Sequence, residues 1–168
     1  MDINELLDDD AFDPKKLFDE KKYSTLIINR EGYSKKENSA ADLIEGLLEP
    51  NITRSESEEI FKKLKDNGST GILVEAIKNA GRIEEKRILT AACWESGLDF
   101  SKDFLFFVQL ATSADFQLAM EAITVVENCE EPIDAGTLHS ALDIAVNSKQ
   151  NNESLSEDLI ANIRLRMK

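Results

Sequence analysis

The chain has 168 residues and a formal net charge of −13, from 33 acidic and 20 basic residues. A chain of this length can bury a hydrophobic core without disulfides or metal, and its charge argues against binding to nucleic acid or to anionic membranes. The N-terminus, MDINELLDDD, has no signal pattern, and no apolar run is long enough to span a bilayer. We therefore expect a cytoplasmic protein of one domain with an arm.

Residues 1–36 differ in pattern from the rest of the chain. Their acidic and basic residues are interleaved, and Tyr23–Asn29 carries β-type residues with no evident strand to pair with. We expect an acidic, partly irregular arm laid on a helical body. The acids between Asp9 and Glu20 are spaced much like those of a calcium loop, but Pro14 stands where such a loop needs glycine, so we reject a calcium site.

From residue 37 onwards, apolar residues recur at helical spacing. The first predicted helix begins after Ser39 and ends before Pro50. A second begins at the capping box Ser55-x-x-Glu58 and ends at Gly68. The residues predicted to be buried in these two helices are Leu43, Ile44, Leu47, Leu48, Ile60, Phe61 and Leu64.

The next two predicted helices follow the same pattern. One starts at Ser69 or Thr70 and is closed by Gly81, and the other runs from about Ile83 to Ser96 and is closed by Gly97. Their predicted buried residues are Ile72, Leu73, Ala76, Ile77, Ala80, Ile88, Leu89, Ala92 and Cys93.

The stretch from Ser101 to Asn128 holds the most apolar segment of the chain, FLFFVQLA. A helix that is apolar on nearly every side must be covered by its neighbours. We predict that Ser101 caps this helix and that Ser113 caps a partner helix with a single apolar face. The predicted buried residues of the pair are Phe104, Phe107, Val108, Ala111, Leu118, Ala119, Ala122, Ile123 and Val126.

Two further helices are predicted near the C-terminus. Asp134 caps the first, and the capping box Ser154-x-x-Glu157 opens the second. Arg164 and Arg166 fall in the last turn, where positive charge opposes the helix dipole. The predicted buried residues are Leu138, Ala141, Leu142, Ala145, Val146, Leu159, Ile160 and Ile163.

Three of the predicted helices recur at a similar interval. Their apolar runs begin at Ile72, Phe104 and Leu138, which are 32 and 34 residues apart, and each run is followed by a turn and a second helix. The repeating unit is a helical hairpin. Since one hairpin cannot bury its own apolar face, we expect the hairpins to stack.

The pattern resembles the HEAT-repeat family of α-solenoids over about residues 69–168, with a weaker unit at 38–67. The nearest segment, Leu110–Asn128, has the short polar turn of the family, then Asp115, then a helix containing alanines. Arg87 is similar to the basic residue that the family often carries early in its second helix. The last hairpin departs from the pattern, because its turn is longer and its second helix lacks the alanines.

This resemblance implies an all-α fold, a right-handed stack of antiparallel helical hairpins. Residues 37–168 would form a helical-repeat domain of about four hairpins, and residues 1–36 would form the arm. An irregular helical bundle is the alternative.

The sequence carries no catalytic or cofactor-binding signature and no metal-binding one. His139 is the only histidine, and Cys93 and Cys129 lie outside any CxxC pattern. We expect both cysteines to be reduced and buried, and His139 to be structural. The glycines are scattered and form no phosphate-binding loop. We therefore expect no enzyme, no cofactor and no metal.

Aromatic residues at helical spacing allow two interpretations. They form either a core or a ligand pocket or partner groove, and the core is favoured. The residues concerned are Trp94, Phe100, Phe104, Phe106, Phe107 and Phe116.

One charge pattern points to binding. Between Lys102 and Lys149 there is no Lys or Arg, while acids are frequent. In stacked hairpins the corresponding turns lie along one edge, so Asp115 belongs to one edge and an acidic group to the opposite edge. Solubility and acidic helix starts account for part of the pattern, and steering of a basic partner is the functional interpretation. The candidate partner-binding residues are Asp115, Glu127, Glu130, Glu131 and Asp134.

We therefore expect a non-enzymatic protein–protein interaction module, an adaptor or regulator that docks a basic partner; the resemblance implies this role, since HEAT-like proteins are adaptors and scaffolds. The alternatives are a structural, self-associating helical protein and an enzyme on a HEAT-like scaffold. DNA glycosylases of that kind depend on a basic concave face, which an acidic chain does not offer. The sequence names neither the partner nor the oligomeric state.

Overall fold

The computed structural model describes residues 39–68, 70–148 and 153–168. The predicted arm at 1–36, with the Asp9–Glu20 segment, lies outside these ranges. The described residues form eight α-helices and one short 3-10 helix and no strand, which confirms the all-α prediction. The α-helices are α3 (Ala40–Leu48), α4 (Arg54–Asn67), α5 (Gly71–Asn79), α6 (Ile83–Glu95), α7 (Phe104–Ala111), α8 (Phe116–Glu127), α9 (Ala135–Asn147) and α10 (Glu153–Arg166).

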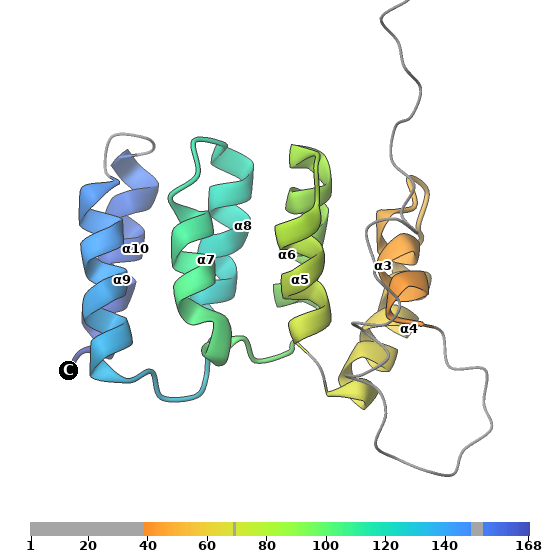
Figure 1. The fold of residues 1–168 in the computed structure, drawn as a ribbon, viewed down its shortest axis with the longest axis horizontal. Helices are drawn as coiled ribbons and strands as arrows, with labels where there is room; N and C mark the ends of the chain where they lie inside the picture. Colours follow the sequence, from red (N-terminus) through yellow and green to blue (C-terminus); the bar gives the residue numbers. More distant parts are fainter. Residues whose placement is uncertain (1–38, 69, 149–152) are drawn as a thin grey trace, which may run out of the picture.

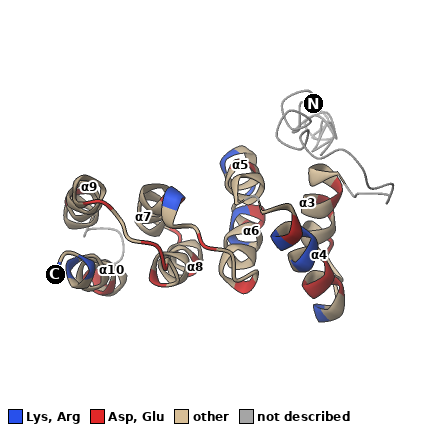
Figure 2. Ribbon diagram, turned by 90° about the horizontal axis from the view of Figure 1, so that it is seen from below, with Lys and Arg blue, Asp and Glu red and all other residues tan. Residues whose placement is uncertain are grey.

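The helices follow one another as four pairs, which lie side by side in a row (Figure 1). In the last three pairs the two helices run antiparallel. Seen from below, α5, α7 and α9 lie in one layer and α6, α8 and α10 in the other (Figure 2). Contacts between neighbouring pairs join α3 to α5 and α6, α6 to α8, α8 to α10, and α7 to α9. Each pair therefore covers apolar surface of the next.

Several predicted helix ends are confirmed. Ser39 and Asp42 form a capping box at the start of α3, and Asp134 caps α9 by accepting from the Thr137 amide at 3.0 Å. Gly68 and Gly97 have φ values of 60° and 61°, the left-handed conformation in which glycine meets no steric cost.

Two predicted capping boxes are wrong by one or two residues. Thr53 and Glu56 form the box of α4, because Thr53-x-x-Glu56 offers the same chemistry two residues before Ser55. Helix α10 already begins at Glu153, so Ser154 lies inside it. An acidic residue in the first turn suits the positive end of the helix dipole.

Three further predicted ends are also wrong. Asp115, not Ser113, caps α8, because the backbone enters the helix at Phe116 and the Asp115 carboxylate then accepts from the Leu118 amide. Ser101 lies in the 3-10 helix Ser101–Asp103 that precedes α7, and its hydroxyl donates to Asp99. Gly81 is not a left-handed cap, since the chain leaves α5 in an extended conformation.

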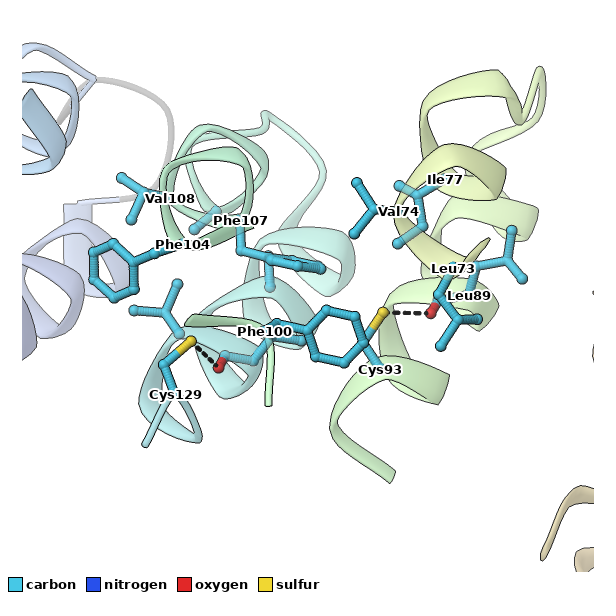
Figure 3. Packing of buried hydrophobic residues seen from close by; sticks show 14 of the residues in the cluster. Leu73, Val74, Ile77, Leu89, Cys93, Phe100, Phe104, Phe107, Val108 and Cys129 are labelled. Carbon is cyan, nitrogen blue, oxygen red and sulfur yellow. Dashed lines mark hydrogen bonds between the residues drawn. The ribbon is translucent and has the colours of Figure 1, made fainter. Parts of the chain in front are cut away.

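The core runs through all four pairs, and the predicted faces of α5 and α8 are fully buried. Phe107 is its centre: the side chain has no exposed surface, and its ring meets Phe100 and Phe106 edge to face at centroid distances of 5.3 and 5.1 Å. Figure 3 shows Phe107 between the side chains of neighbouring helices, with Val74 and Ile77 across from it. Such ring pairs stabilise a core beyond the area that they bury.

The prediction that Cys93 and Cys129 are free and buried is confirmed. Each thiol donates to the carbonyl four residues earlier, Leu89 and Val125 respectively (Figure 3). Burial raises the pKa of the Cys93 thiol well above its usual value and that of Cys129 to about 11. Both cysteines therefore stay protonated at neutral pH, and neither is an activated nucleophile.

Three residues predicted to be core are exposed. Ile88 and Val146 are each 44% exposed, and Phe116 is 56% exposed. On α6 the buried face contains Glu85 and Leu89, so Ile88 points away from the neighbouring helices. Helical spacing shows that one face is apolar, but the position of neighbouring helices decides which edge of that face is covered.

We expect Phe107→Ala to lower the free energy of unfolding by about 3–5 kcal/mol, because it removes a fully buried ring and leaves a cavity. Phe116→Ala is the matched control, since the same change at an exposed ring is expected to cost less than about 1 kcal/mol. Urea unfolding followed by circular dichroism measures both. Equal losses at the two positions would show that the core is not arranged as described.

Candidate functional site

Four of the five predicted partner-binding residues lie along one edge of the row, at the end of α8 and in the turn that joins it to α9. The turns that join α6 to α7 and α8 to α9 are at the lower end in Figure 1, and Figure 2 looks onto that end. The last residue of α8 and the three acids between it and α9 are all exposed. We name them the acidic edge: Glu127, Glu130, Glu131 and Asp134.

The acidic edge is held in place by Asp99 from the preceding turn. The Asp99 carboxylate accepts from the amides of Glu130 and Glu131 at 3.3 and 3.1 Å, and from the Ser101 amide at 2.9 Å. Burial raises the pKa of Asp99, but these hydrogen bonds and that of the Ser101 hydroxyl outweigh it and lower the pKa overall. Because the backbone is fixed in this way, the glutamate side chains project from a defined position.

A basic side chain from α10 also reaches this edge of the row. Arg166 donates to the carbonyl oxygens of Val126, Glu127 and Cys129 at 2.9, 3.1 and 2.8 Å, and its guanidinium carbon lies 5.6 Å from the centroid of the Phe104 ring. The sequence predicted Arg166 to oppose the dipole of its own helix; the structure shows that it also caps the C-terminal end of α8.

None of the four carboxylates of the acidic edge takes part in an ion pair with another described residue. The Asp134 carboxylate already caps α9. The hydroxyl and the amide of Thr137 donate to this carboxylate, and both hydrogen bonds lower the pKa of Asp134. Lys102, in the 3-10 helix, is an exposed cation at the same end. The field of the edge is therefore negative, with the three glutamates contributing most of it.

Asp115 has a structural role at the opposite end of α8. Its carboxylate accepts two hydrogen bonds from the Arg87 guanidinium, the one from Nε at 2.9 Å, and one from the Leu118 amide at 2.8 Å. The hydrogen bonds from Arg87 are the largest cause that holds the pKa of Asp115 at about 2. The pair joins α6 to α8, so we leave Asp115 out of the proposed docking surface.

A groove of about 580 Å³ lies between α4 and α6. The indole Nε1 of Trp94 donates to Glu121 at 2.7 Å, which fixes the ring at the wall of this groove. The sequence predicts Phe61 to be in the core and allows Trp94 to be in either the core or a groove. It does not show how α4 packs against α6, which decides both positions. The lining residues are Ile52, Arg54, Ser57, Glu58, Phe61, Trp94 and Glu95.

The described ranges contain no group of three or more His, Cys, Asp or Glu side chains arranged to hold a metal ion, and none of their helices is long and apolar enough to cross a membrane. The exposed ring of His139 is hydrogen bonded through Nδ1 to the Ala135 carbonyl at 2.6 Å. Its position on α9 is that of an ordinary helix-surface residue.

Comparison with the models of known protein families, with curated proteins and with solved structures gives no match for this chain. Function is therefore inferred from the fold and from the chemistry of its surface.

We expect Asp115→Asn to lower the melting temperature at neutral pH, because asparagine still caps α8 but carries no charge to pair with Arg87. A carboxylate whose pKa is depressed to about 2 contributes stability above its ordinary pKa, and this contribution is lost as the pH falls towards 2. The gap in melting temperature should thus be constant above about pH 5 and close towards about pH 2.

Asp134→Asn is the matched control for that experiment, since Asp134 is also an N-cap but has no basic partner among the described residues. The difference in melting temperature between Asp134→Asn and the unchanged chain should be smaller at neutral pH than that for Asp115→Asn. Thermal unfolding of the three proteins over the same pH series compares them directly, and an Asp115→Asn gap that persists at the lowest pH would contradict the ion-pair assignment.

We expect Arg166→Lys to lower the free energy of unfolding by about 1–2 kcal/mol, because an ammonium group cannot reach three carbonyls from one position. Arg164 is an exposed residue in the same turn of α10, so Arg164→Lys should change the free energy of unfolding by less than about 0.5 kcal/mol. Chemical denaturation measures both values. Equal effects would mean that the bonds from α10 to the end of α8 contribute little.

Proposed function

We propose that this chain is a non-enzymatic protein-binding module of HEAT-like architecture that docks a basic segment of a partner protein on its acidic edge. The observation that carries the proposal is the α8–α9 turn. Asp99 holds the backbone of Glu130 and Glu131, and Arg166 holds that of Glu127 at the end of α8. These three side chains form no ion pair with any described residue.

The contacts between helix pairs support the architectural part of the proposal. Two of the positions that carry the HEAT resemblance, Arg87 and Asp115, pair with each other across neighbouring hairpins. The second helices α6, α8 and α10 contact one another in order, as stacked repeats require. A right-handed superhelix of such repeats is the architecture that we infer from these links.

The charge distribution supports a basic partner. The 46 residues between Lys102 and Lys149 contain no Lys or Arg, and the acidic edge lies within this span. Like charges gathered on one surface steer an oppositely charged partner and speed its association, and they repel acidic surfaces. The thiols of Cys93 and Cys129 are buried and protonated, so they offer no competing nucleophilic chemistry.

Self-association is a second candidate function, favoured by exposed apolar side chains on α8 and α10. Phe116 and Met120 are one turn apart on α8 and are 56% and 45% exposed, and Leu165 on α10 is 65% exposed. Apolar groups of this size on a surface favour contact with another protein or another copy. Sedimentation velocity over a range of concentrations tests this: a single monomer species throughout excludes it.

We expect the triple variant Glu127→Lys, Glu130→Lys and Glu131→Lys to lose a basic partner that the unchanged chain retains from native host lysate at low salt. Affinity capture followed by mass spectrometry measures this. Retention by the unchanged chain should also fall at high salt, because exposed charge pairs are screened.

The matched control reverses the same number of exposed acids on α10, as Glu153→Lys, Glu157→Lys and Asp158→Lys, and should still retain the partner. Equal loss from both triple variants would show that net charge, not the acidic edge, matters. If the unchanged chain retains no basic protein at all, the proposed docking function is wrong.

A further inference from the structure

The groove between α4 and α6 combines aromatic rings with carboxylates, the groups that attract a cationic side chain. The apolar part of its wall is formed by Ile52 and Phe61 on the α4 side and by Trp94 on the α6 side, and the remaining lining residues are polar or charged. Phe61 and Trp94 are both half-buried, so each ring is partly covered by the protein and partly open to the groove. The walls suit an apolar stem, such as the methylene chain of a long basic residue.

The carboxylates of the groove leave one negative charge without a partner. Glu58 is paired with Arg54 at 3.0 Å, and Arg54, whose side chain is 94% exposed, also lines the groove. Glu95 is exposed at the groove and has no ion pair within the described ranges. Burial is the main cause that raises the pKa of Glu95, the neighbouring charge of Glu121 adds to it, and Arg54 counteracts it.

The protein already places its own cations over other aromatic rings. Lys78 Nζ lies 5.4 Å from the centroid of the Phe106 ring, and the Arg166 guanidinium lies 5.6 Å from that of Phe104. Trp94 has no such cation among the described residues, although tryptophan is the aromatic side chain that attracts a cation most strongly. The Trp94 ring is nevertheless fixed through Glu121, so it is ordered before any ligand arrives.

We propose that this groove binds an arginine side chain of a partner polypeptide, with the stem against Phe61 and Ile52 and the guanidinium between Trp94 and Glu95. Arginine fits better than lysine, because its planar group stacks on an aromatic ring and bonds a carboxylate with two donors at once. The site is separate from the acidic edge and does not require that edge to bind anything.

The test uses Trp94 as its own reporter, because it is the only tryptophan of the chain. The full chain is titrated with an end-blocked peptide of sequence Ala-Leu-Arg-Leu-Ala while tryptophan emission is recorded. The control peptide carries citrulline, which has the shape of arginine without the charge. We expect a saturable change in emission with the arginine peptide and an affinity for the citrulline peptide at least about fivefold weaker.

Glu95→Gln should weaken binding of the arginine peptide about fivefold, because it removes the charge of the groove and keeps its shape. Glu59→Gln is the matched control, an exposed acid of α4 that does not line this groove, and should bind as the unchanged chain does. Both variants keep Trp94 and the aromatic walls, so the reporter stays intact.

The triple variant of the acidic edge should also bind the arginine peptide normally, which separates failure of that edge from failure of the groove. Equal affinity for the arginine and citrulline peptides would overturn the proposal. So would an unchanged emission at millimolar peptide, or an equal loss of affinity in Glu95→Gln and Glu59→Gln.

Discussion

The segment FLFFVQLA of α7 is apolar on nearly every side, so it can be shielded from water only if helices from more than one pair cover it. Its buried residues contact α8 within the pair and α9 and α10 of the next pair. On the side of the preceding pair, Phe106 is half-buried and Lys78 of α5 lies over its ring. This requirement for cover on both sides explains why the pairs form a row, with α7 and α8 inside it (Figure 1).

Polar contacts between neighbouring pairs set how the row is aligned. The pair Arg87–Asp115 links α6 to α8, Asp99 holds the backbone of the α8–α9 turn, and Arg166 holds the end of α8. Each contact provides a hydrogen-bond partner for polar groups of a helix end or a turn, which apolar packing cannot do. The charged side chains in these contacts are bonded within the protein, whereas the exposed glutamates of the acidic edge form no ion pair with any described residue.

The faces and ends of the helices show how far the sequence predicts this fold. The residues that apolar spacing predicted to be buried on α5 and α8 are all buried, but Val74 and Val125, which are buried as well, were not predicted. Apolar spacing failed at Ile88, whose exposure depends on where α8 and α3 lie around α6. The predicted helix caps lie within two residues of the observed ones. The errors arise because several hydroxyls and carboxylates near one helix start can all act as caps. At α8 only the path of the backbone selects Asp115 over Ser113.

The sequence by itself determined the all-α class, the succession of helices in residues 39–168, the burial of both cysteines and the span without basic residues, because these follow from local spacing and composition. Only the tertiary structure decided which charges stay free. Asp115 and the acids of the edge look alike in sequence, yet the packing of α6 on α8 brings Arg87 to Asp115, whereas no cation of the described residues pairs with Glu130. It likewise decided that Trp94 borders a groove, since that depends on contacts between segments that are distant in sequence.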